Sequence, residues 1–287
     1  MDHSAYHLTQ PGARDTSVIF ASPHSGRDYT SAFLAQVCVD IEQIRSSEDA
    51  FVDQLYAAAP DAGAPLLRAV APRAFVDLNR SADELDAALI AGVRRVSSNP
   101  RVASGLGVIP RVVANGRMIY DGKIPLAVAH ERIKGFWRPY HDRLQALLDE
   151  SHQAFGQAIL IDCHSMPHEA VAPLNFGNGV PPNVVLGDRF GASAGTSIVE
   201  QAEAAFAAAG FRVARNAPFA GAYIAQHYGR PSRRQHVLQV EIDRSIYMDE
   251  ATLRPHSGFD ETQARLTQVI AELAQIGRPN KAHLAAE

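Results

Sequence analysis

Two histidines each follow a short apolar run of the sequence. His24 comes two residues after the segment 17–22 (SVIFAS), and His164 comes three residues after the segment 158–161 (AILI). Short, uninterrupted runs with β-branched residues are typical of strands buried in a parallel or mixed sheet. Ligands of open α/β sheets bind beyond the carboxyl ends of such strands. The sequence therefore predicts that both imidazoles lie where chemistry is usually done.

Two histidines and one carboxylate form the ligand set of a catalytic zinc site with an open position for water. Asp28, Glu48 and Asp49 could each supply the carboxylate, and their spacing from His24 does not choose among them. Glu48 and Asp49 also suit the first turn of a helix predicted over 46–59, where capping and the helix dipole favour acids. Because histidine and carboxylate also bind other divalent ions, the pattern does not fix the metal.

Glu241 lies in the otherwise apolar run 236–242 (HVLQVEI). A charge in a buried strand costs free energy unless it is paired, bound to a metal or functional. Strand alternation puts Gln239 and Glu241 on one face. We therefore predict that Glu241 points into a pocket, where it could act as a general base on a metal-activated water.

Arg80 follows Asn79 in the tetrapeptide 77–80 (DLNR), at the end of a strand predicted over 73–78. A guanidinium offers a bidentate fork to a carboxylate, and an amide adds a donor. We therefore predict that Asn79 and Arg80 bind a carboxylate of the substrate. The alternative is that Arg80 forms a surface salt bridge. The polar and aromatic patch 221–231, which includes Tyr223 and His227, could line the same pocket or could pack as an ordinary loop.

Alternating strands and helices are predicted to position these residues, which favours an α/β sandwich. Beyond the segments above we expect strands over 64–70, 183–186 and 211–215, a hairpin over 108–120, and helices over 125–155 (broken near Gly135 and Pro139), 193–209 and 261–277. The segment 167–183 is predicted to be a loop long enough to form an active-site lid. His141 falls at a helical spacing that suits packing, so we assign it no chemistry.

Composition excludes several classes of protein. The chain has 287 residues, of which 46% are hydrophobic, so it can bury a large core, and we expect a single domain over 1–287. A net charge of −4 without long runs of one sign predicts binding to neither nucleic acid nor membrane. The N-terminus lacks signal-peptide features and no apolar stretch could span a bilayer, so we expect a cytoplasmic protein with a small-molecule substrate. Its oligomeric state does not follow from the sequence.

Seven motifs, in family order between about residues 17 and 250, resemble those of the N-formylglutamate amidohydrolases. They are SPHSG at 22–26, SEDAFVDQLY at 47–56, DLNR at 77–80, PYH at 139–141, DCHSMP at 162–167, the split motif GAYI…HYGRP at 221–231, and QVEIDRSIYMDE at 239–250. The family is similar to zinc carboxypeptidases and aspartoacylases. The resemblance thus implies a single-domain mixed parallel/antiparallel sheet flanked by helices, of a phosphorylase/hydrolase-like, zinc carboxypeptidase-like kind.

The resemblance also implies roles for individual residues. It makes His24 and His164 ligands of Zn²⁺ or another divalent metal, and Glu241 the general base. Asn79 and Arg80, with Tyr223 and His227, would bind substrate. In the carboxypeptidases a glutamate ligand lies three residues after the first histidine, but that position here is Arg27. Asp49 matches the acid that the amidohydrolases carry before a VDxLY-like helix, so we choose it as the third ligand and keep Glu48 in reserve.

The activity that the resemblance implies is zinc-dependent hydrolysis of the amide bond of an N-acyl acidic amino acid, such as N-formyl-L-glutamate in histidine degradation. Two alternatives remain at this stage. The chain could be another N-acyl amino-acid deacylase or carboxypeptidase-like amidase, or it could bind an acidic metabolite without turnover.

Overall fold

A central sheet of seven strands organises the fold, which is seen in a computed structural model that describes residues 4–93, 99–174 and 179–279. The strand order is β1-β3-β2-β6-β9-β7-β8. Strand β1 pairs antiparallel with β3, and β7 pairs antiparallel with β9, whereas the other neighbours are parallel. The strands are β1 Tyr6–Thr9, β2 Val18–Ser22, β3 Leu66–Ala69, β6 Ala158–Met166, β7 Val184–Gly187, β8 Val213–Arg215 and β9 Gln235–Asp243.

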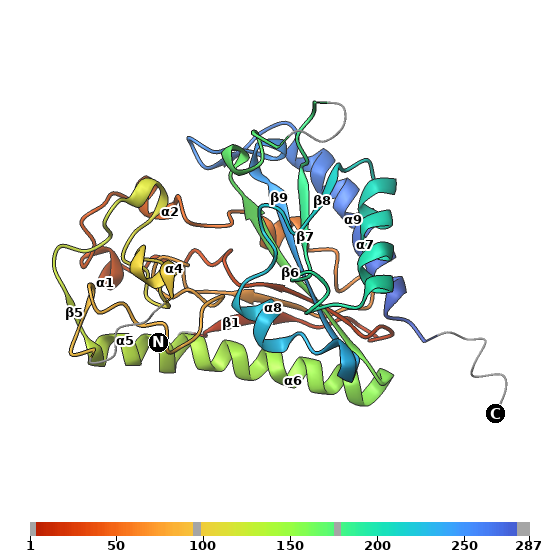
Figure 1. Ribbon diagram of the computed structural model, residues 1–287, viewed down its shortest axis with the longest axis horizontal. Coiled ribbons are helices and arrows are strands. Elements are labelled where there is room, and N and C mark those ends of the chain that lie inside the picture. Colours follow the sequence, from red (N-terminus) through yellow and green to blue (C-terminus); the bar gives the residue numbers. More distant parts are fainter. Residues whose placement is uncertain (1–3, 94–98, 175–178, 280–287) are drawn as a thin grey trace.

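Helices cover both faces of this sheet (Figure 1). The α-helices are α1 Ser31–Leu34, α2 Ile41–Arg45, α3 Val52–Leu55, α4 Pro100–Ala103, α5 Leu126–Arg132, α6 Arg138–Phe155, α7 Thr196–Ala208, α8 Tyr223–Tyr228 and α9 Phe259–Ile276. Short two-residue strands pair outside the sheet, β4 Ile90–Ala91 with β5 Ile124–Pro125 and β10 Met248–Asp249 with β11 Arg254–Pro255. The predicted fold class, a mixed sheet flanked by helices, is confirmed.

Most of the apolar core of the described residues lies in two layers, one on each face of the sheet, and a small third cluster contains Met166, Val171, Val185 and Ala214. Val18 and Phe20 of β2 pack into the layer that includes α3, α7 and α9, whereas Ile19 packs into the layer that includes α5, α6 and α8. Successive side chains of a strand point to opposite faces, so each central strand contributes to both layers. Within the described residues, no helix is both long and apolar enough to cross a bilayer.

The strand around His164 is longer than predicted. We expected it to stop after Ile161, but β6 continues from Asp162 to Met166 and pairs with β9 along its whole length, from Ala158 opposite Gln235 to Met166 opposite Asp243. The expectation failed because polar residues usually mark a strand end, whereas here the polar side chains are buried among partners. His164 therefore lies within the sheet rather than in the loop after it.

Three other predicted elements differ in the structure. The segment 46–59 contains only the short helix α3, because Phe51 at its start has a left-handed φ of 66°. The segment 73–78 is no strand, because Phe75 and Val76 donate backbone hydrogen bonds to Pro72 in a turn. In the segment 108–120, Val112 and Met118 form only an isolated bridge around a 3₁₀ turn at Ala114–Gly116.

The remaining helix and loop predictions agree more closely. The expected break in the helix over 125–155 is a π-helical turn at Ile133–Trp137, between α5 and α6. Of the predicted lid over 167–183, residues 175–178 lie outside the described residues, and a 3₁₀ turn forms at His168–Ala170. The organisation of residues 1–287 as a single domain stays a prediction.

Candidate metal and substrate site

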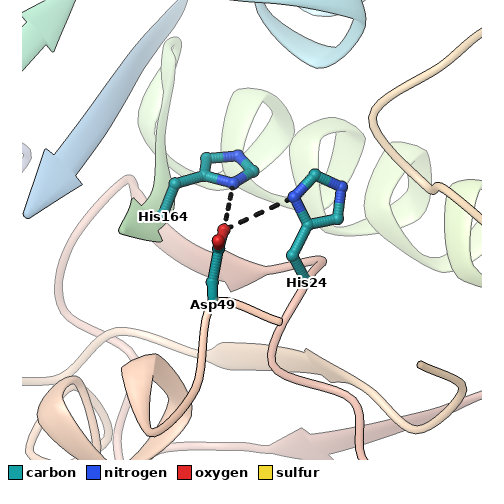
Figure 2. Close-up of side chains that lie close together, drawn as sticks. All are labelled: His24, Asp49 and His164. Atoms are coloured by element: carbon teal, nitrogen blue, oxygen red, sulfur yellow. Dashed lines mark hydrogen bonds and ion pairs between the residues drawn. The ribbon is translucent and has the colours of Figure 1, made fainter. Parts of the chain in front are cut away.

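Three buried side chains that are far apart in the sequence converge at the carboxyl end of β2 and in β6. His24 follows β2, Asp49 precedes α3 and His164 lies in β6. One ligand atom from each lies within 4.8 Å of the other two, and all three residues are buried. Figure 2 shows the carboxylate of Asp49 facing both imidazole rings. Among the described residues, one group of histidines and acids is arranged so that it could hold a metal ion, and it consists of these three residues.

The face of β6 and β9 that carries the site changes from apolar to polar along the strands. On this face Leu160 lies opposite Val237, followed by Asp162 opposite Gln239 and His164 opposite Glu241. The first pair packs against the helical layer beneath, whereas the next two pairs are polar and buried. The alternation of side chains thus places His164 and Glu241 side by side from two parallel strands.

The loop of His24 and the segment of Asp49 are held together by the backbone. The amide of Asp49 donates to the carbonyl of His24 at 3.0 Å. Gly26 passes so close to the loop after β3 that an added Cβ would lie 2.1 Å from the carbonyl oxygen of Ala71. Glycine is therefore required at this position, because any side chain would displace the His24 loop.

Asp49 uses its two oxygens for different partners. Oδ2 lies 2.9 Å from Nδ1 of His164 and 3.4 Å from Nδ1 of His24. Oδ1 accepts a hydrogen bond from Nη2 of Arg244 at 3.0 Å. Glu48 instead accepts two hydrogen bonds from Arg45, so it does not belong to the group. The geometry therefore brings Asp49, rather than Glu48, to the histidines, and the role of Asp49 as a metal ligand stays a prediction.

The donor set fits a divalent metal. Nδ1 of His24 is buried and makes no hydrogen bond among the described residues, because its 3.4 Å contact with Oδ2 of Asp49 lacks hydrogen-bond geometry. The opposite nitrogens face acids: Nε2 of His24 is hydrogen-bonded to Asp77 Oδ1 at 2.8 Å, and Nε2 of His164 lies within ion-pair distance of Asp162 Oδ2, at 3.1 Å. Metal-binding histidines commonly have such a carboxylate on the second nitrogen, which leaves the first free to coordinate.

The electrostatics of the group also favour a cation. Burial alone would raise the pKa of Asp49, but the close contacts and the charge of His164 and His24 hold it well below its usual range. Burial alone would lower the pKa of His164, but the carboxylates of Asp162 and Asp49 raise it well above its usual range. The negative potential that stabilises a protonated imidazole would equally stabilise a metal ion.

A cavity of about 510 Å³ contains the group together with Asn79, Arg80 and Glu241. Its size is typical of sites for small molecules. Glu241 is buried and accepts a hydrogen bond from Nε2 of Gln239 at 2.8 Å. Burial raises the pKa of Glu241 to about 7. A carboxylate of this kind can both take and return a proton near neutral pH.

Asn79 and Arg80 occupy the cavity differently. Oδ1 of Asn79 accepts from the amide of Ile224 at 2.7 Å and its Nδ2 lies 3.2 Å from Nε2 of His164, so its amide group connects α8 to the histidine. Within the described part of the chain, Arg80 donates only to the backbone carbonyls of Leu106 and Asn79. Its guanidinium has no acidic partner among the described residues, and it therefore remains available to an anionic ligand.

The aromatic patch contributes less to the cavity than expected. Tyr223 lines a smaller neighbouring cavity of about 170 Å³, which also contains Arg80. His227 lines neither cavity and stacks on Tyr223, with ring centroids 5.0 Å apart. The substrate-binding roles of both residues stay predictions.

Several residues of the site were not predicted. Asp77, Asp162 and Gln239 contact the histidines or Glu241, and each lies within two residues of a predicted site residue, so proximity in the sequence was an available signal. Arg244 follows the QVEID motif but gives no local sign of its bond to Asp49. Arg73, which pairs with Asp77, also lines the cavity.

His141 has a positioning contact rather than simple packing. Its Nε2 lies 2.9 Å from the carbonyl oxygen of Leu78, and its Nδ1 lies 2.8 Å from the hydroxyl of Tyr228. Burial lowers the pKa of His141 to about 3, so the ring is neutral. A neutral ring that donates through Nε2 and accepts through Nδ1 satisfies both partners and fixes the backbone before Asn79.

Comparison with known proteins supports one family. A family model described as N-formylglutamate amidohydrolase matches residues 16–248. The N-formylglutamate deformylase of Pseudomonas putida is 31% identical over 258 residues, which covers 88% of this chain and 88% of that protein. The enzyme of the same name from Pseudomonas aeruginosa is 30% identical over 269 residues, covering 91% of this chain and 94% of that protein.

Solved structures show the same relationship. The crystal structure of an N-formylglutamate amidohydrolase from Ralstonia eutropha has a TM-score of 0.88 at 33% identity, and the match covers 95% of this chain and 98% of that one. A gene product of Agrobacterium tumefaciens has a TM-score of 0.64 at 14% identity, with coverage of 100% and 98%. The second likeness shows the fold alone.

Proposed function

Because the chain belongs to the N-formylglutamate amidohydrolase family, we propose that it hydrolyses the formyl amide bond of N-formyl-L-glutamate and releases formate and glutamate. The observation that carries this proposal is the buried group of His24, Asp49 and His164 in the same cavity as Glu241. A metal-binding group and a carboxylate base in one cavity are the parts that metal-assisted amide hydrolysis uses.

The three residues of the group would hold Zn²⁺ or another divalent metal. When bound, such an ion supplies Lewis acidity, which polarises the scissile carbonyl and lowers the pKa of water. The contribution of this chain is to fix the ligands before binding. Arg244 holds Oδ1 of Asp49 and Asp77 holds Nε2 of His24, so the remaining atoms face one another.

Glu241 would move the proton. As the oxygen of water bonds to the formyl carbon, the carboxylate of Glu241 accepts a proton from that water. It then donates this proton to the amide nitrogen while the carbon–nitrogen bond breaks, which yields formate and the free amine. A pKa of about 7 suits both transfers, because the group must act first as a base and then as an acid.

Arg80 would hold a substrate carboxylate. Its Nε and Nη1 are occupied by backbone carbonyls, which fixes the plane of the guanidinium beside the cavity. A carboxylate bound there would bring the amide of an acidic amino acid toward the histidines and Glu241. Orientation of this kind lowers the entropy cost of reaction.

The test is a comparison of acyl substrates. Purified protein supplied with Zn²⁺ is incubated with N-formyl-, N-acetyl- and N-succinyl-L-glutamate, and the released acid is followed by proton NMR. We expect formate release from N-formylglutamate to be the fastest reaction. Faster release of acetate or succinate would indicate another deacylase, and the absence of any released acid would contradict enzymatic function.

A further inference from the structure

Three arginines line both the main cavity and the smaller cavity beside it. Arg80 precedes the turn at 81–85, Arg101 lies on α4 and Arg189 lies in the turn after β7, so three separate segments deliver them. The two cavities have volumes of about 510 and 170 Å³. Because all three side chains line both, they gather where the cavities adjoin.

These arginines differ from Arg73 and Arg244 near the site, because they have no acidic partner among the described residues. Arg73 pairs with Asp77 at 3.0 Å, and Arg244 pairs with Asp49 at 3.0 Å. Within the described parts of the chain, neither Arg80, Arg101 nor Arg189 lies within 4.0 Å of a carboxylate oxygen, although Glu84 also lines the smaller cavity. The joint lining thus carries an excess of positive charge that a single carboxylate would not neutralise.

Arg189 is held in position by its surroundings. Its backbone has a left-handed φ of 53°, and its amide donates to Ala220 at 2.8 Å. Nη1 donates to the carbonyl of Gly221 at 3.3 Å, and a Cβ added to Gly221 would lie 3.2 Å from Cγ of Arg189. A strained backbone in a non-glycine residue persists only where the surrounding structure imposes it, and such residues are concentrated at functional sites.

The turn that carries Arg189 is itself tied to the segment opposite. Asn216 accepts from the amide of Asp188 at 3.1 Å and donates to its carboxylate at 2.6 Å. A Cβ added to Gly187 would lie 2.7 Å from the backbone of Ala220, so the two segments pass too close to each other for a side chain at this position. The guanidinium is therefore presented to the cavity from a rigid support.

We propose that Arg189, assisted by Arg101, binds the second carboxylate of a dicarboxylate substrate, while Arg80 binds the first. The assignment of Arg80 to the carboxylate nearest the amide follows from Asn79, its neighbour, which contacts His164. The inference rests on the proposed function, since N-formylglutamate has two carboxylates on one short carbon chain. It adds the residue that makes the site select diacids over monoacids.

The test measures binding rather than turnover. Glutarate and its monoamide, glutaramate, have the same length but differ by one carboxylate. Their dissociation constants are measured by calorimetry for the Zn²⁺-loaded wild type, for R189Q and for R254Q, which removes an exposed arginine from β11. A charge-assisted hydrogen bond changes affinity by about tenfold or more. We expect wild type and R254Q to prefer glutarate by at least that factor, and R189Q to lose most of the preference.

An unchanged preference in R189Q, or no preference in the wild type, would overturn the assignment. R189K provides a second variant if R189Q does not fold, and it should lower the preference because lysine lacks the planar fork. The proposed function fails separately. If R189Q loses the preference of the wild type for glutarate while the wild type releases no formate from N-formylglutamate, the activity is contradicted and the role of Arg189 is still supported.

Discussion

At the scale of single residues, Glu241 has an environment unlike that of a surface acid. It is buried beside His164 and Gln239, and burial raises its pKa to about 7. The variant E241Q keeps the shape of the side chain but cannot accept a proton. We expect it to bind Zn²⁺ and glutarate like the wild type, while formate release falls by about 10²- to 10⁴-fold.

The control for this variant is E200Q, which removes an exposed carboxylate from α7. Steady-state formate release and metal content are measured on both. Loss of metal in E241Q would show that Glu241 is a ligand, and near-normal turnover would show that it is a buried structural partner.

Substitutions of the adjacent acids Asp49 and Glu48 should have clearly different effects on Zn²⁺ binding. Asp49 faces both histidines, whereas Glu48 bonds to Arg45. Removing a residue that only hydrogen-bonds a metal ligand typically weakens metal binding by about 10- to 100-fold. Because Asp49 would itself be a ligand, D49N should weaken Zn²⁺ binding by more than this factor, whereas E48Q should leave Zn²⁺ affinity unchanged. Competition with a fluorescent chelator gives both affinities. The reverse result would make Glu48 the ligand.

Residue types and motifs predicted the three residues of the candidate metal site better than they predicted the residues that hydrogen-bond to them. His24, Asp49 and His164 were identified from strand ends and a family motif, and the structure brings them together. The bond from Arg244 to Asp49 joins residues 195 positions apart, so no local pattern could reveal it. Such contacts depend on tertiary packing rather than on neighbours in the sequence.

At the scale of elements, the loop after β2 is the most demanding part of the site. G26A would place a Cβ 2.1 Å from the carbonyl oxygen of Ala71, so the loop must move and His24 with it. We expect a loss of about 1–3 kcal/mol in the free energy of unfolding, together with weaker Zn²⁺ binding.

Urea unfolding and chelator competition measure the two effects of G26A. The matched control is G12A, because nothing lies within 4 Å of a Cβ added to Gly12. Normal metal affinity in G26A would show that the position of His24 does not depend on this close approach.

Long apolar runs predicted the elements well, and polar signals did not. β2, β9, α7 and α9 form where apolar runs or periodic patterns predicted them. The acids at 48–49 fitted the start of a helix, but Asp49 faces the histidines instead and the helix begins only at Val52. Contacts within the site therefore outweighed the local helix preference of residues 48–49. In β6, contacts within the site likewise kept residues 162–166 in the strand, although polar residues usually mark a strand end.

At the scale of the whole molecule, the two core layers share the central strands. β2, β6 and β9 contribute alternate side chains to both layers, so neither layer is complete without the other. We therefore expect residues 1–287 to unfold in one cooperative transition. Calorimetry tests this, because the calorimetric and van't Hoff enthalpies agree for a two-state transition. Two separate transitions would show that the chain has two domains.

The central claim is that His24, Asp49 and His164 form the metal site on which hydrolysis depends. The most direct test is the Zn²⁺ content of purified wild type and H164A by mass spectrometry after dialysis against a metal-buffered solution, with circular dichroism to confirm that both are folded. The account predicts about one ion per chain in the wild type, as for a mononuclear catalytic site, and almost none in folded H164A. Full metal occupancy in H164A would contradict it.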